Sequence, residues 1–216
     1  MKRVLLSASI LFFSALSADV GVPTSTLAQD ISIQKLIEGN MRYVNNASIR
    51  PLQDATRRKE LLNSQAPFAV IVCCSDSRVP PEIIFDQGLG DIFVIRVAGN
   101  VVGPLELDSV EYAADILKSP LILVLGHASC GAVDAVIKGD SIPEDIENIA
   151  PLIMPAVERA RTMKGDLLEN ATILNVKNTM KTLEQSPILN ALLKANKLKI
   201  ACGYYELGTG KVRMID

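Results

Sequence analysis

The sequence predicts a single α/β domain built on a mainly parallel central β-sheet with helices on both faces. Three short apolar runs rich in β-branched residues, 68–73, 92–97 and 121–125, have the composition of strands that are buried on both faces. Segments of helical length separate these runs, and an alternation of strand and helix is typical of parallel sheets. With 216 residues, 49% of them hydrophobic and 21% charged, the chain can bury one sizeable core.

The N-terminal residues have the pattern of a cleaved export signal. Lys2 and Arg3 precede an apolar run over residues 4–16, which is too short to cross a bilayer comfortably. Signal peptidase prefers small residues before its cut, and the chain offers them up to Ala28 and, as a second possibility, up to Ser17. We therefore expect export to the periplasm or the medium, with a retained anchor as the alternative.

The predicted organisation is a signal peptide over residues 1–28 and one folded domain over residues 31–216. No stable membrane anchor is expected after cleavage. The sequence contains no internal repeat and no low-complexity tract.

Helices are predicted before, between and after the three strands. From Ile31 to about Val44, apolar residues recur at three- and four-residue steps and form one face of a helix. Pro151 and Pro155 are expected to break a longer helical segment near the C-terminus. The predicted helices span residues 31–44, about 52–63, about 105–118 and, with that break, 142–182.

The end of the chain is predicted to form a hairpin. Two runs of strand composition, 200–206 and 211–215, flank a turn that contains Gly208 and Gly210. This hairpin is expected to add an edge to the sheet.

Charge and cysteine content narrow the function classes. A formal net charge of -2 leaves no excess of Lys and Arg to neutralise phosphates, so nucleic acid is a poor partner and small-molecule chemistry is favoured. The cysteines at positions 73, 74, 130 and 202 lack the spacing of a small disulfide-bonded domain, which favours metal binding. His127 is the one histidine of the chain, so all imidazole chemistry falls on it.

Two polar segments follow the first and third predicted strands. Cys74 comes directly after the first strand, and His127 and Cys130 follow the third. Because the carboxyl ends of strands in an open α/β sheet border one crevice, these segments can converge there. Cys130 is expected in the first turn of the next helix, on the same side as His127. Three such ligands leave the fourth position of a tetrahedral zinc site for water, as in catalytic sites.

Asp76 and Arg78 lie beside the first predicted ligand. Two thiolates and an imidazole cancel the charge of zinc, so the metal should acidify its water less strongly than in a three-histidine site. On an extended segment, residues two apart face the same way, so Arg78 can pair with Asp76 while the carboxylate orients the water.

Each of these residues also has a purely structural interpretation. A buried cysteine is usually a small hydrophobic residue, a lone histidine a satisfied polar group, and an Asp-x-Arg pair a surface ion pair. Their combination at two strand ends favours the metal site. Cys73 is expected in the core, because successive strand residues face opposite ways, and a Cys73–Cys202 disulfide is left open.

Cys-x-Asp-x-Arg followed later by His-x-x-Cys resembles the β-carbonic anhydrase family. The resemblance extends over residues 36–40, 74–101, 126–131 and 208–211, and so covers essentially the chain from residue 31. It implies the β-carbonic anhydrase fold and reversible hydration of CO2 to bicarbonate and a proton. The implied residues are Cys74, His127 and Cys130 for one Zn²⁺ per chain, the catalytic dyad Asp76 and Arg78, and Asp76 as a conditional fourth ligand.

The plant-like subgroup of that family lines its pocket with a glutamine, a phenylalanine and a tyrosine, some of them reaching across a dimer interface. Gln65, Phe93 and Tyr112 occupy the corresponding places, although Phe93 is equally suited to an ordinary strand core. The resemblance therefore implies CO2 and bicarbonate as substrates and a homodimer or a higher homo-oligomer.

Two other functions remain open. A relative of the same fold could hydrolyse carbonyl sulfide or carbon disulfide, because an activated water can attack those linear molecules too. A non-catalytic, zinc-stabilised binding module is the alternative of a different class. It would need neither an open coordination position nor an Asp-Arg pair.

Overall fold

The centre of the fold is a mixed β-sheet, seen in a computed structural model that describes residues 24–139 and 146–216. Among these residues five strands form the sheet in the order β2-β1-β3-β4-β5. β1 to β4 are parallel, and β5 runs antiparallel to β4, so the predicted α/β fold with its C-terminal edge hairpin is confirmed. The strands are β1 (Ala69–Cys73), β2 (Ile92–Arg96), β3 (Leu121–His127), β4 (Lys199–Tyr205) and β5 (Val212–Ile215).

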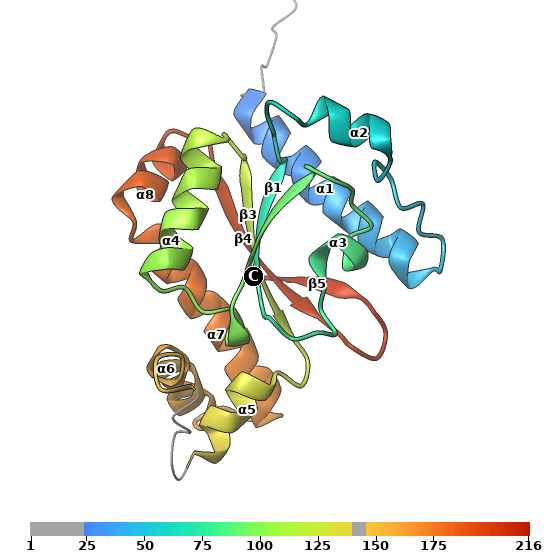
Figure 1. The fold of residues 1–216 in the computed structure, drawn as a ribbon. Helices are drawn as coiled ribbons and strands as arrows, with labels where there is room; N and C mark the ends of the chain where they lie inside the picture. Colours follow the sequence, from blue (N-terminus) through green and yellow to red (C-terminus); the bar gives the residue numbers. More distant parts are fainter. Residues whose placement is uncertain (1–23, 140–145) are drawn as a thin grey trace, which may run out of the picture.

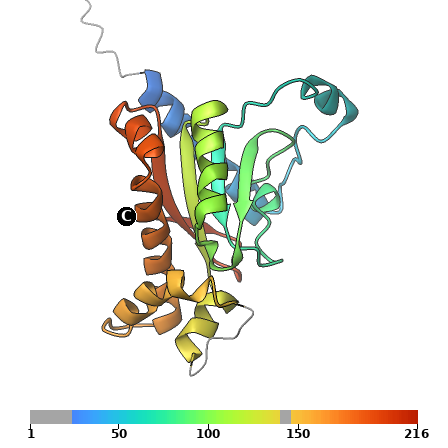
Figure 2. The same ribbon diagram turned by 60° about the vertical axis from the view of Figure 1, so that its left-hand side comes forward.

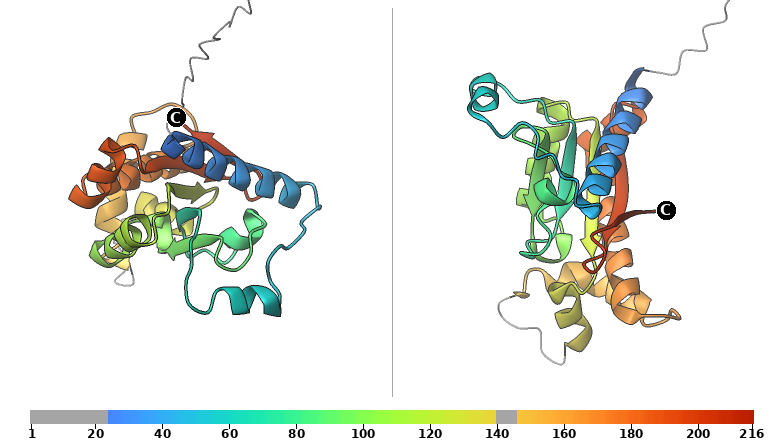
Figure 3. Two further views of the ribbon diagram at one scale, coloured as in Figure 1. Left: turned by 90° about the horizontal axis from the view of Figure 1, so that it is seen from above. Right: turned by 90° about the vertical axis from the view of Figure 1, so that its right-hand side faces the viewer.

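Helices cover both faces of the sheet (Figure 1). α1 (Thr24–Val44) and α3 (Pro81–Ile84) lie on one face, and α4 (Pro104–Glu111), α7 (Leu167–Glu184) and α8 (Pro187–Lys194) on the other (Figure 3). This explains why β1 and β3 are buried throughout and apolar except for His127 at the end of β3: side chains alternate between two helical layers, and neither face meets water. α5 (Gly131–Lys138) and α6 (Ala150–Ala160) lie beyond the carboxyl end of β3 (Figure 2).

The helix boundaries differ in part from those predicted. α1 begins at Thr24 rather than at Ile31, and α2 (Ala55–Glu60) is shorter than predicted, starting after an Asp54 side chain that accepts from the Arg57 N–H. The helix predicted over 105–118 consists of α4 and a π-helical turn over Tyr112–Ile116.

The break predicted near Pro155 is wrong, whereas the α-helix does begin directly before Pro151, at Ala150. Pro151 lies in the first turn of α6, where its missing N–H would have no helical partner, and α6 continues past Pro155. The break follows α6 instead, where Gly165 has a φ of +104° and the Asp166 carboxylate caps α7 by accepting from the Glu169 N–H.

The predicted signal peptide lies almost entirely outside the described residues, so its cleavage stays a prediction. Ala28, the expected cleavage position, is part of α1. The next residue, Gln29, is buried and donates a 3.0 Å hydrogen bond from Nε2 to the Asn196 carbonyl. Within the described segments, no helix is long and apolar enough to span a membrane.

Candidate metal centre

Cys74, His127 and Cys130 converge at the carboxyl edge of the sheet and are called here the metal centre. Cys74 directly follows β1, His127 is the last residue of β3, and these two strands are neighbours. The Sγ atoms and a ring nitrogen of His127 all lie within 4.8 Å of one another. All three side chains are buried, so these donors are shielded from bulk water.

The local backbone brings Cys130 to this position by a turn and not by the helical spacing that the sequence predicted. Ser129 has a left-handed φ of +53°, and Cys130 has extended backbone as the N-cap of α5. From this position the Cys130 sulfur contacts that of Cys74.

The donor set fits a zinc ion. His127 Nδ1 lies 2.9 Å from the Ala128 carbonyl, to which it can only donate, and this leaves a lone pair on Nε2, which is buried without a hydrogen-bond partner. A hydrogen bond from Cys130 lowers the pKa of Cys74, and the same bond and burial raise the pKa of Cys130. This hydrogen bond favours ionisation of Cys74, and sulfur with imidazole nitrogen is a donor set that zinc prefers.

The other two cysteines lie outside the metal centre. Cys73 packs with Ile71 in the core on the α1 side, and burial raises its pKa to about 12. Cys202 packs in the core on the α7 side, with its sulfur 3.4 Å from Met180 Sδ. Because they face opposite sides of the sheet, they do not form the disulfide that the sequence left open, and both are free.

Asp76 and Arg78 form a bidentate ion pair beside the metal centre. Arg78 donates from Nε to Asp76 Oδ1 at 2.9 Å and from Nη2 to Oδ2 at 2.6 Å. The segment is a turn and not the extended stretch predicted, because the Val79 N–H bonds to the Asp76 carbonyl and the Arg78 N–H to Asp76 Oδ1. Such a turn, with an Asp side chain capping its own backbone, fixes the carboxylate closely.

The carboxylate is directed toward the metal centre. Asp76 Oδ2 lies 4.0 Å from His127 Nε2, the nitrogen that has no partner. Hydrogen bonds from Arg78 hold the pKa of Asp76 well below its usual range, so the carboxylate is ionised at neutral pH. Arg78 also donates to the Ser129 carbonyl at 3.2 Å and thereby links the segment of Cys74 with that of His127 and Cys130.

Sequence reasoning missed two groups that support Cys74. Arg96, at the end of β2, donates to the carbonyls of Cys74 and Asp76 at 3.1 and 2.6 Å. The Gly99 and Asp76 N–H groups donate to Cys74 Sγ at 3.3 and 3.4 Å. A charged residue in the apolar run 92–97 was the one sequence signal for Arg96, and a backbone donor leaves no sequence signal at all.

Gln65, Phe93 and Tyr112 lie together, but away from the metal centre of their own chain. Gln65 and Tyr112 line a surface hollow of about 770 Å³, and the rings of Phe93 and Tyr112 are 6.3 Å apart between centroids. Phe93 pairs with Val70 near the amino end of β1, whereas Cys74 follows the carboxyl end of that strand. One chain therefore does not bring these three residues to the predicted ligands.

Comparison with known proteins identifies the family. A model of the carbonic anhydrase family matches residues 69–212, the part of the chain that holds the whole metal centre. The chain belongs to the carbonic anhydrase family. A carbonic anhydrase of Mycolicibacterium smegmatis is 38% identical over 184 residues, which cover 83% of this chain and 89% of that protein.

Solved structures place this carbonic anhydrase in the β class. The β-carbonic anhydrase CcaA superposes with a TM-score of 0.66 at 29% identity, over 85% of this chain and 87% of that one. The Coccomyxa β-carbonic anhydrase, solved with acetazolamide, superposes with a TM-score of 0.63 at 28% identity, over 85% and 86% of the two chains. The family and the fold both support hydration of CO2.

Proposed function

We propose that this carbonic anhydrase is a zinc enzyme that converts CO2 and water reversibly into bicarbonate and a proton. Cys74, His127 and Cys130 would hold one zinc per chain. The observation that carries the proposal is the buried, unpartnered His127 Nε2, which lies with the sulfur atoms of Cys74 and Cys130 in one cluster of possible metal ligands. When bound, zinc with three protein ligands keeps one position for water and lowers the pKa of that water toward neutrality.

Asp76 orients the attacking water in this proposal. Arg78 occupies one side of each carboxylate oxygen, so a further lone pair on Oδ2 can accept a hydrogen bond from a water at the metal centre. That hydrogen bond turns a lone pair of the water oxygen toward the carbon of CO2. The same carboxylate is close enough to act as the conditional fourth ligand, and the fork of Arg78 opposes that movement.

The proton released by hydration must leave without a histidine relay. His127 is the one histidine in the sequence; its Nδ1 is bonded to the Ala128 carbonyl, and its Nε2 would be taken up by the zinc. Water and dissolved buffer are therefore the carriers, and the rate should rise with buffer concentration.

Metal analysis coupled to stopped-flow assays tests this function. We expect about one zinc per chain and hydration of CO2 in preference to hydrolysis of carbonyl sulfide or carbon disulfide, because Gln65 provides a polar amide beside Phe93 for a product that forms hydrogen bonds. Faster turnover of either sulfur compound would favour the hydrolase alternative. Zinc-loaded protein without any CO2 hydration would favour the binding module.

We further propose that a second copy of the chain completes the site. Gln65, Phe93 and Tyr112 can act on CO2 at the metal centre if a partner chain supplies them, since their own chain holds them near the opposite strand ends. α1 also has an apolar surface that the described residues leave open, with Leu27, Ile31 and Met41 each about half exposed.

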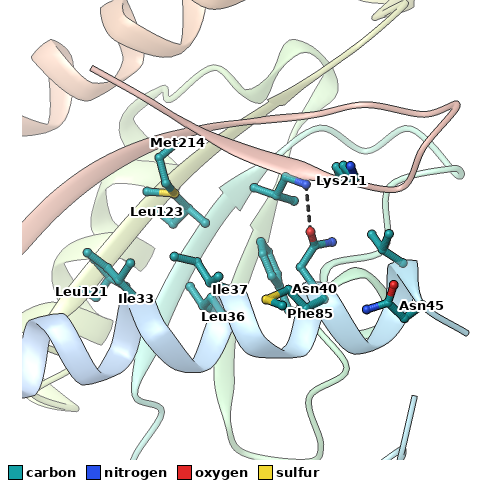
Figure 4. Close-up of a pocket in the computed structure, with 13 residues that line it drawn as sticks. Ile33, Leu36, Ile37, Asn40, Asn45, Phe85, Leu121, Leu123, Lys211 and Met214 are labelled. Atoms are coloured by element: carbon teal, nitrogen blue, oxygen red, sulfur yellow. Dashed lines mark hydrogen bonds between the residues drawn. The ribbon is translucent and has the colours of Figure 1, made fainter. Parts of the chain in front are cut away.

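A cavity of about 350 Å³ continues this surface between α1 and the sheet (Figure 4). Its lining is mostly apolar and includes Leu36, Ile37 and Met214, while Asn40 closes one end by accepting the Val212 N–H at 2.9 Å. An exposed apolar strip beside an apolar cavity suits the apolar surface of another copy of the chain.

Light scattering of the purified protein should give at least a dimer at assay concentration.

Met41→Glu places a charge on the apolar surface and should weaken self-association by more than about tenfold, the equivalent of 1.4 kcal/mol. As the protein is diluted, its activity should fall together with the fraction of chains that are associated. The control is Ile188→Glu, which adds the same charge to an exposed isoleucine on α8. A fully active monomer would show that no partner residue is needed.

A further inference from the structure

α7 has a buried polar face directed toward the metal-centre end of the sheet. Thr172, Asn175 and Thr179 are each at most 5% exposed, and their spacing of three and four residues puts them on one side of the helix. Figure 2 shows α7 running along the sheet. Because a buried polar group costs free energy unless it is hydrogen-bonded, such a face requires specific partners.

Two of these side chains hold the turn η1 (Ala98–Asn100), which follows β2. Gly99 and Asn100 have left-handed φ values of +70° and +48°, so their carbonyls cannot continue the hydrogen-bond pattern of the strand. Asn175 Nδ2 donates to the Gly99 carbonyl at 2.6 Å, and Thr179 Oγ1 donates to the Asn100 carbonyl at 3.1 Å. α7 therefore supplies the donors that these two carbonyls need.

The η1 turn also contacts Cys74, one of the predicted metal ligands. The Gly99 N–H donates to Cys74 Sγ at 3.3 Å in a buried position. A hydrogen bond to a thiolate withdraws part of its negative charge and fixes the direction of its lone pairs. The position of this N–H depends on the turn, and the position of the turn depends on Asn175 and Thr179.

We propose that Asn175, assisted by Thr179, is a positioning residue that acts through the Gly99 N–H on the Cys74 sulfur. It sets how strongly that sulfur donates charge to a bound metal. The inference rests on the proposed zinc site. It assigns a role to a helix that contributes no ligand and follows the ligands in the sequence.

Four variants separate this role from ordinary packing. Asn175→Leu and Thr179→Val remove the two donors while keeping the number of side-chain heavy atoms, and Thr179→Ser keeps the hydroxyl. Thr172→Val is the matched control: Thr172 is equally buried on the same helix face, but its hydroxyl bonds to the Leu168 carbonyl of its own helix at 2.8 Å. Thr172→Val should therefore change stability without changing the metal centre.

The main readout is the protein loaded with Co²⁺, whose thiolate-to-metal charge-transfer absorption reports the charge on sulfur. Loss of the Gly99 hydrogen bond should shift this absorption to longer wavelength in Asn175→Leu, and less in Thr179→Val. Zinc affinity, measured by competition with a chelating dye, should fall about tenfold in Asn175→Leu. The pH midpoint of CO2 hydration should rise, because a sulfur that donates more charge makes the metal a weaker acid.

The outcomes distinguish this inference from the proposed function. A parent protein that binds neither Zn²⁺ nor Co²⁺ would overturn the zinc site itself. If the parent binds both metals, and Asn175→Leu and Thr179→Val show the parental absorption and pH midpoint, the positioning role is overturned. Should Asn175→Leu fail to fold, the Thr179→Val and Thr179→Ser pair still decides, since a shift that serine reverses supports the role.

Discussion

His127→Ala should abolish measurable CO2 hydration and lower zinc affinity by at least about a hundredfold. Changes to residues that only support a metal ligand already lower metal affinity or activity about 10–100-fold, and His127→Ala would remove a ligand itself. No other histidine exists in the chain to replace it. The measurements are zinc content after dialysis against a chelator and stopped-flow hydration of CO2 on the same samples.

The neighbouring cysteines provide a matched pair for this experiment. Cys74→Ala should lose zinc and activity as His127→Ala does, whereas Cys73→Ala should keep both, because Cys73 packs in the core with Ile71. Full activity in His127→Ala, or two zinc ions per parent chain, would contradict the assignment of the ligands. Equal losses in the two cysteine variants would mean that packing at the end of β1 governs activity.

Arg78→Ala should keep its zinc and lose about a hundredfold or more in kcat, a loss typical of removing a group that orders the reacting atoms. Arg78 donates twice to the Asp76 carboxylate, so its loss frees that carboxylate to turn toward the metal centre. Arg78→Lys should lose less, since a point charge keeps the attraction but not the two-pronged geometry. Asp76→Asn should retain zinc and lose activity, because an amide orients the water poorly.

Arg213→Ala is the control for the charge change. Arg213 makes an ion pair of the same length with Glu169, at 2.6 Å, and has a similarly exposed side chain, but it lies on β5 at the edge of the sheet. It should show parental turnover. Parental turnover in Arg78→Ala with zinc intact would mean that the Asp76–Arg78 pair is merely structural.

Ionisation of Asp76 has a defined effect on the pH profile. Arg78 lowers the pKa of Asp76 in the folded protein, so the carboxylate contributes stability above its unfolded pKa and loses that contribution only as the pH falls through the lower folded value. A decline of activity near neutral pH in the parent therefore has another origin. Removing Arg78 should abolish most of this contribution, so the stability of the variant should depend less on pH in the acid range than that of the parent.

Sequence patterns predicted that Cys74, His127 and Cys130 converge, because polar residues follow two predicted strands at the ends that a parallel sheet brings together. Apolar runs of strand length identified β1 and β3, and parallel strands bring their carboxyl ends together whatever the intervening chain does. The same reasoning failed in local detail. Asp76 and Arg78 pair through a turn and Cys130 precedes α5, because short polar segments adopt turns that periodicity does not describe.

The α/β class, the order of the main elements and the convergence of Cys74, His127 and Cys130 could be predicted from local sequence patterns. The residues that support this metal centre and the positions of Gln65, Phe93 and Tyr112 became clear only in the folded chain. Cys74 receives a hydrogen bond from Gly99, which Asn175 holds from 76 positions away in the chain. Local patterns report which face of an element is buried, whereas partners so distant in sequence are set only when the layers pack.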